Sequence, residues 1–165
     1  MKMETIVKIG MIALFCVMMA GSASAWNLNP TVNLGSGTFT LVPINTSNSY
    51  TLDWQSDIGA LEKASIDCSF SYSVDDTWYP DYDSFYLVDL NGISDDYTNS
   101  TAWFLYDDND NIMPYGLGNN TMEDGDRIKF KYCSYTVDYD TWETTVDDDN
   151  ATDILNIKCN FQGVL

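Results

Sequence analysis

Polar and apolar residues alternate over several short stretches of the chain, which is the spacing of half-buried β-strands. Residues 38–42 and 50–54 alternate in this way on either side of a turn-like segment, so together they predict a β-hairpin. Residues 26–36 lack the pattern and predict an irregular lead-in. Further strands are predicted at residues 68–74, 85–90, 101–106, 127–137 and 154–161.

One segment, at about residues 58–65, has the spacing of a helix instead. Ile58, Leu61 and Ala64 recur every third residue and would share one face. Ser56 or Asp57 just before them is a suitable N-cap. The helix is too short to be stable alone, so packing against a sheet must hold it. One hairpin, one short helix and further strands predict an α+β, β-grasp-like fold with a mostly antiparallel sheet.

The N-terminal 25 residues have the layout of a secretory signal peptide. Lys2 and Lys8 precede or open an uncharged apolar run at residues 9–20, which is short for a membrane span of about 20 residues. Residues 23–25, Ala-Ser-Ala, form a small-residue cleavage site. The sequence therefore predicts a secreted or extracellular surface protein, without a membrane span once residues 1–25 are removed, whose single domain is residues 26–165.

The composition is strongly acidic, with 7 Lys and Arg against 25 Asp and Glu and a net charge of −18. Removal of residues 1–25 leaves 5 basic and 24 acidic residues, a net charge of −19. This charge repels phosphate backbones, so nucleic acid is not expected as a partner. The chain contains no His, the commonest general base, and no pair of carboxylates is marked out as a glycosidase site, so we expect no enzyme.

Three cysteines remain in residues 26–165, and an exported protein permits disulfides. The pairing of Cys133 with Cys159 is favoured because both lie in predicted strands that could form one hairpin. The alternative is that Cys68 and both of these are buried as small apolar side chains. Glycosylation sequons are also present, at Asn45, Asn99, Asn119 and Asn150.

The acidic turns are candidate Ca²⁺ sites, and Ca²⁺ is the one cofactor that the sequence leaves open. The run Asp107-x-Asn109-x-Asn111 begins like an EF-hand loop. The sixth position is Ile112 rather than Gly and the twelfth is Gly118 rather than Glu, so an EF-hand is excluded. Irregular Ca²⁺ sites remain open, as does the alternative that these acids are solvated turns suited to salt. The candidate ligands are Asp107, Asp108, Asp110, Asp147 and Asp149.

Aromatic residues gather in the predicted loop at residues 75–83. Trp78, Tyr79 and Tyr82 lie there among acidic neighbours. Rings on loops can stack on flat ligands or anchor a protein interface, and acids beside them suit cationic ligands. The alternative is that these rings cap the end of the sheet.

Four stretches resemble, in their order and spacing, the C-terminal β-domain of the cobalamin carriers transcobalamin and intrinsic factor, and a related uncharacterised small domain of secreted bacterial and archaeal proteins. They are Ile-Gly-Ala-Leu at residues 58–61, Leu-Val-Asp-Leu-Asn-Gly-Ile at 87–93, Trp-Phe-Leu-Tyr at 103–106, and Tyr-Gly at 115–116 followed by residues 122–128. The resemblance covers about residues 38–132, so residues 133–165 would be an extra C-terminal hairpin.

This resemblance implies a non-enzymatic binding domain that holds a small, corrinoid-like ligand or a surface protein through aromatic and loop residues. One such domain would cover only one face of a corrinoid. The alternative function is a structural or adhesive surface module whose acidic turns bind Ca²⁺ or tolerate salt. The residues that the resemblance places against the ligand are Trp103, Phe104, Leu105, Met113 and Gly116.

Overall fold

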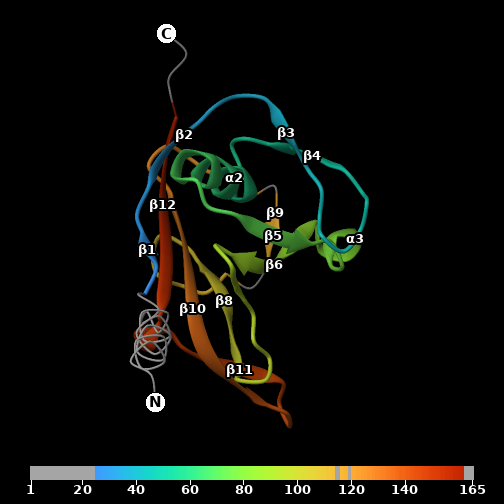
Figure 1. Ribbon diagram of the computed structural model, residues 1–165, viewed down its shortest axis with the longest axis vertical. Coiled ribbons are helices and arrows are strands. Elements are labelled where there is room, and N and C mark those ends of the chain that lie inside the picture. Colours follow the sequence, from blue (N-terminus) through green and yellow to red (C-terminus); the bar gives the residue numbers. More distant parts are fainter. Residues whose placement is uncertain (1–24, 114–115, 119, 162–165) are drawn as a thin grey trace, which may run out of the picture.

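A computed structural model describes residues 25–113, 116–118 and 120–161 (Figure 1). Its largest element is a six-stranded sheet in which the long strand β10 lies between β8 on one side and β12 and β11 on the other. β1 and β2 continue the sheet beyond β12 and run parallel to it. The strands are β1 (Asn27–Leu28), β2 (Thr31–Leu34), β8 (Thr101–Tyr106), β10 (Arg127–Asp138), β11 (Glu143–Asp147) and β12 (Asp153–Phe161).

Smaller sheets stand beside the main one. β3 (Thr38–Leu41) and β4 (Tyr50–Asp53) form an antiparallel hairpin, which confirms that prediction. A four-stranded antiparallel sheet has β6 paired with β5, β7 and β9. Its strands are β5 (Tyr72–Asp75), β6 (Ser84–Leu90), β7 (Ile93–Ser94) and β9 (Leu117–Gly118), and the short helices are α3 (Tyr79–Tyr82) and η1 (Asp148–Asn150).

The predicted helix is α2 (Asp57–Cys68). Ser56 caps it, because its hydroxyl accepts a hydrogen bond from the Gly59 amide at 3.1 Å. The apolar stripe of Ile58, Leu61 and Ala64 is fully buried, and α2 contacts β2, β12, β4 and β9. The helix runs three residues past its predicted end. The strand predicted at residues 68–74 therefore begins only at Tyr72, as β5 (Tyr72–Asp75).

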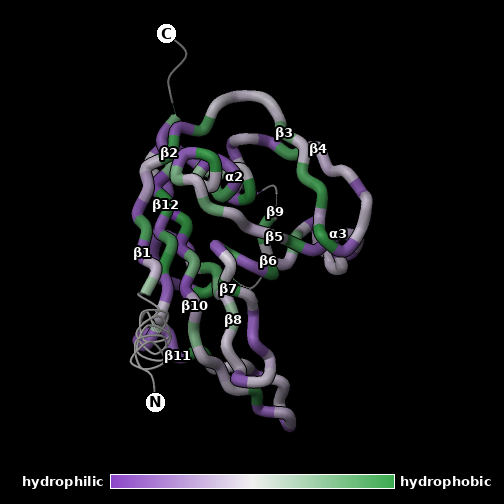
Figure 2. Tube along the Cα trace, viewed as in Figure 1, coloured by the Kyte–Doolittle hydropathy of each residue, from purple (hydrophilic) through white to green (hydrophobic). Residues whose placement is uncertain are grey.

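The core lies between α2, the main sheet and the smaller sheets. Successive residues of β10 and β12 alternate in hydropathy, as Figure 2 shows along both strands. Ile128 and Phe130 of β10 are opposite Ile157 and Leu155 of β12, and all four are at most 1% exposed. The next residues along each strand point to the other face, which carries the polar side chains.

Two parts of the main sheet differ from what the sequence predicts. Residues 26–36 are not an irregular lead-in, because β1 and β2 pair with β12, and Val32 and Leu34 are buried. Residues 133–165 include the β10–β11 hairpin, but β12 lies inside the main sheet between β10 and the N-terminal strands. Both differences concern pairings between distant parts of the chain. The protein is mostly β, with mixed and antiparallel sheets and few helices, and its assignment as a β-grasp stays a prediction.

The register of β10 and β12 determines whether Cys133 and Cys159 can form a disulfide. Lys158 is opposite Arg127, and Cys133 lies six residues farther along β10. Cys159 is one residue past Lys158, on the side away from Cys133, so the two are separated by seven residues along the ladder. At about 3.4 Å per residue they are about 24 Å apart, whereas disulfide Cα atoms lie within about 7 Å. The expected Cys133–Cys159 disulfide is therefore wrong, and both residues are buried free thiols. Cys68 is also free.

The predicted signal peptide lies outside the described residues except for Ala25. In the described part of the chain, no helix is long and apolar enough to cross a membrane.

Candidate functional site

A cavity of about 490 Å³ lies along β8, and we call it the β8 cavity. It extends from Ile112, Met113, Gly116 and Leu117 to the β10–β11 hairpin. We call the buried apolar residues that line it the floor, and the half-buried or exposed residues that line it the rim. The floor contains Leu87, Ala102, Trp103, Leu105, Leu117 and Phe130, and the rim contains Tyr86, Tyr97, Phe104, Ile112, Met113, Gly116, Tyr135 and Thr144.

Trp103 is a fixed part of this floor. Its indole Nε1 donates to the Ile93 carbonyl at 2.8 Å, and its backbone amide donates to Asp95 Oδ1 at 2.9 Å. Its ring also packs against Tyr132 with 5.2 Å between centroids. With only 6% of its surface exposed, Trp103 presents one preformed aromatic wall to the cavity.

Phe104 and Tyr135 form part of the rim. They point to the same side of the sheet and meet edge to face with 5.8 Å between ring centroids. Ala102, opposite Cys133 on β10, lies between them in the register and also lines the cavity. The two rings therefore stand on either side of a small residue, where an apolar ligand could contact both.

Ile112, Met113, Gly116 and Leu117 line the other end of the β8 cavity. The Met113 amide donates to the Leu105 carbonyl at 2.8 Å, which ties this segment to β8. A Cβ atom on Gly116 would lie 2.1 Å from the Phe85 carbonyl oxygen, so only glycine fits here. Gly116 therefore contributes to the cavity through close backbone packing rather than through a side chain.

Asp57 holds β9, which follows Gly116, through a hydrogen bond to Gly118. The sequence predicted only a capping role for this residue. It is fully buried, and its carboxylate accepts hydrogen bonds from the Ile58 amide at 2.6 Å, the Gly118 amide at 2.9 Å and the Asn120 side chain at 2.6 Å. Burial raises its pKa to about 6, although all three hydrogen bonds act in the opposite direction. Asp57 thus joins the start of α2 to β9.

A second cavity, of about 470 Å³, lies beside the first, and we call it the Trp78 cavity. Tyr86 and Tyr97 line both cavities. The Tyr97 hydroxyl donates to the Tyr86 hydroxyl at 3.2 Å, and the Tyr86 hydroxyl donates to Asp95 Oδ2. Burial raises the pKa of Asp95. The full lining is Asp75, Thr77, Trp78, Tyr86, Val88, Ser94, Asp95 and Tyr97.

The aromatic residues predicted at residues 75–83 are separated by the structure. Trp78 lines the second cavity, whereas Tyr79 packs against Tyr50 and Phe85 at 4.3 and 4.5 Å between ring centroids. Tyr82 is 68% exposed and lines neither of these two cavities. Tyr79 and Tyr82 fall in α3, so the segment is not simply a loop.

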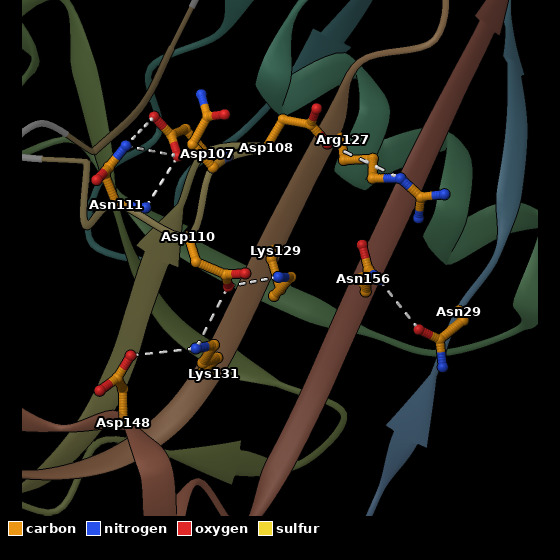
Figure 3. A network of polar contacts seen from close by, with 11 residues as sticks. Asn29, Asp107, Asp108, Asp110, Asn111, Arg127, Lys129, Lys131, Asp148 and Asn156 are labelled. Atoms are coloured by element: carbon orange, nitrogen blue, oxygen red, sulfur yellow. Dashed lines mark hydrogen bonds and ion pairs between the residues drawn. The ribbon is translucent and has the colours of Figure 1, made fainter.

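The acidic turns pair with basic side chains on the polar face of the main sheet (Figure 3). Lys131 lies 3.2 Å from Asp148 and 3.5 Å from Asp110, and Lys129 also pairs with Asp110. Arg127 lies 3.8 Å from Asp108. These contacts neutralise part of the acidity and hold the turns over the sheet.

The remaining predicted calcium ligands are engaged locally or exposed. Asp107 accepts hydrogen bonds from the amides of Asn109 and Asn111 at 2.8 and 2.9 Å. Asp147 accepts from Asn150 at 3.0 Å, and Asp149 is exposed. Nowhere within residues 25–113, 116–118 and 120–161 do three or more Cys, Asp or Glu side chains lie together as a metal site.

Of the sequon asparagines, three are exposed and the fourth lies outside the described residues. Asn45, Asn99 and Asn150 are the exposed ones, and Asn119 is the fourth. The three exposed asparagines are accessible to modification, and glycosylation stays a prediction.

Comparison with known families identifies the part of the chain that holds the site. Residues 63–134 match a domain of unknown function, DUF4430. The DUF4430 segment begins within α2 and ends on β10, and it contains the lining of both cavities except Tyr135 and Thr144. No curated protein and no solved structure matches the chain. These comparisons do not confirm the resemblance to transcobalamin.

Proposed function

We propose that this protein is an extracellular, non-enzymatic binding domain that holds a small, flat, largely apolar molecule in the β8 cavity. One observation carries the proposal: residues from separate segments that the sequence resemblance marked as ligand-contacting line one cavity. These are Trp103, Phe104, Leu105, Met113 and Gly116.

The size and lining of the cavity support this function. Its volume of about 490 Å³ falls within the range of small-molecule sites, about 300–1,000 Å³. Its floor is apolar, while hydroxyls of Tyr86, Tyr97, Tyr135 and Thr144 at the rim could orient a ligand. Aromatic rings on several sides favour a planar ligand through stacking and edge contacts.

The lining favours binding over catalysis. The described residues around the β8 cavity include no carboxylate, amine or thiol, and the whole chain contains no His. General acid–base and nucleophilic chemistry needs such groups within hydrogen-bond reach of the substrate. Apart from the indole N–H of Trp103, which already donates to Ile93, the described lining residues offer only hydroxyls as polar side-chain groups, which suits a site that holds a ligand unchanged.

The experiment titrates two probes while the fluorescence is followed. Phenylnaphthylamine is a flat neutral dye that brightens in apolar sites, and cobinamide is the corrinoid that the resemblance implies. We expect the dye to bind with a micromolar Kd, and saturable quenching of the tryptophan fluorescence by cobinamide would extend the proposal to corrinoids. Tyr135→Ala should weaken dye binding about tenfold by removing one rim ring.

The control is Tyr139→Ala, which removes a second tyrosine from the same hairpin. Tyr139 is 75% exposed and lies outside the cavity lining, so its removal should leave the dye affinity unchanged. Equal losses in both variants would overturn the proposal, and so would the absence of binding by both probes at high micromolar concentration.

A further inference from the structure

The Trp78 cavity combines aromatic rings and carboxylates on the outer face of the smaller sheet. Tyr86 and Val88 reach it from β6, and Asp75 reaches it from β5, where it is paired with Tyr86. Trp78 and Tyr97 come from the connecting segments and are 53% and 67% exposed. Three rings from three separate segments therefore border one concavity of about 470 Å³ with surface free for contact.

The two acids of this cavity have no basic partner. Neither Asp75 nor Asp95 takes part in an ion pair between described residues. The basic side chains of residues 26–165 are elsewhere: Lys63 is on α2, and the other four, Arg127, Lys129, Lys131 and Lys158, are on β10 and β12. The cavity is therefore locally negative within a chain of net charge −18, a field that attracts cations.

The hydrogen bonds of the carboxylates limit which cation fits. Asp95 already accepts the Tyr86 hydroxyl on Oδ2 and the Trp103 amide on Oδ1. Asp75 accepts the Thr77 amide on Oδ1 at 3.1 Å. These groups supply negative charge but few free acceptor atoms, which disfavours a bare metal ion that needs several oxygen ligands.

We propose that the Trp78 cavity is a binding site for a methylated ammonium group, the head group of choline-like molecules. Such a group carries a positive charge but, when fully methylated, no N–H to satisfy. It binds through the faces of aromatic rings and through charge at short range. Trp78, Tyr86 and Tyr97 supply the rings, and Asp75 and Asp95 supply the charge.

The experiment compares choline with dimethylbutanol, a neutral analogue in which carbon replaces the nitrogen, by calorimetry at about 0.15 M salt. We expect choline to bind with a millimolar Kd and the neutral analogue to bind at least about tenfold more weakly. Equal affinity for the two probes would overturn the proposal, because the site would then recognise shape alone. Failure of choline to bind at about 20 mM would also overturn it.

Two pairs of variants locate the site. Trp78→Ala should reduce choline affinity about tenfold, while Trp142→Ala, which removes an exposed tryptophan of the β10–β11 hairpin, should not change it. Asp75→Asn should reduce it several-fold, while Asp81→Asn, which removes an equal charge from α3, should not. Equal losses within either pair would contradict the proposal.

The outcome is independent of the proposed function of the β8 cavity. Trp78 lines only the second cavity, and Tyr135 lines only the first. Trp78→Ala should therefore leave phenylnaphthylamine binding intact, and Tyr135→Ala should leave choline binding intact. Circular dichroism of each variant separates loss of a site from loss of the fold.

Discussion

The buried carboxylate of Asp57 makes stability depend on pH in a defined way. It lies at the start of α2 with none of its surface exposed, and it accepts hydrogen bonds from the Gly118 amide and from Asn120. Replacement of Asp57 by Asn keeps the shape of the side chain and removes its charge. The pH dependence of the difference between wild type and this variant therefore isolates the ionisation of one group.

The sign follows from the pKa, which burial raises from 3.8 to about 6 in the folded protein. The folded state holds the proton up to a higher pH than the unfolded chain does, so the stabilisation is complete below about pH 4 and is lost as pH rises through about 6. At about 1.4 kcal/mol for each pH unit between the two pKa values, ionisation removes about 3 kcal/mol of stability.

The assay is urea unfolding of wild type and Asp57→Asn at several values between about pH 4 and pH 7.5. Wild type should lose about 3 kcal/mol relative to the variant over this interval. Asp67→Asn, which removes an exposed carboxylate from the same helix, should give a difference that is constant within about 0.5 kcal/mol. A constant difference for Asp57→Asn as well would refute the reasoning.

Three further perturbations test other parts of the structure. The hydrogen bond from the Tyr50 hydroxyl lowers the pKa of Asp76 to about 2. The stability that Asp76 provides is therefore present above about pH 4 and lost toward about pH 2. In thermal unfolding, the Tm of Asp76→Asn should lie below that of wild type at about pH 4, and this difference should shrink toward about pH 2. Gly116→Ala should destabilise by about 2 kcal/mol or more in urea, while Gly35→Ala, where a Cβ meets nothing within 4 Å, should stay within about 0.5 kcal/mol. Cys133 and Cys159 should react with a thiol reagent only after unfolding, and a reductant should leave the Tm unchanged. If they stay unreactive after unfolding in the absence of reductant, the conclusion that they are free thiols is wrong.

Local patterns allowed much of the secondary structure to be predicted. The β3–β4 hairpin, the buried stripe of α2, β6, β8 and β10 all follow from spacing within a few residues of one another. The end of α2 was missed because Ile66 and Asp67 are exposed and Cys68 is half-buried, so none of them extends the buried apolar stripe. The helix stops at Ser69, which has a left-handed conformation.

Pairings between distant segments could not be predicted. β1 and β2 have two and four residues, and what stabilises them is the edge of β12, more than 120 residues later in the chain. The same holds for Cys133 and Cys159: both are in strands, as expected, but the register that separates them is set by the whole β10–β12 ladder.

The candidate site was only partly accessible from sequence. The resemblance grouped residues of β8 with Met113 and Gly116, and these do line one cavity. Tyr86, Tyr97 and Tyr135 were missed because strand alternation says which side a ring faces but not which other strand it meets.

The most direct test of the central claim is methyl NMR of the two methionines in residues 26–165, Met113 and Met122. Met113 lines the β8 cavity, whereas Met122 is buried outside its lining. Addition of phenylnaphthylamine to protein labelled at the methionine methyls should shift the Met113 signal through the ring current of the dye and leave Met122 in place. A dye that binds while Met113 stays unshifted would contradict the proposal that the ligand occupies the β8 cavity.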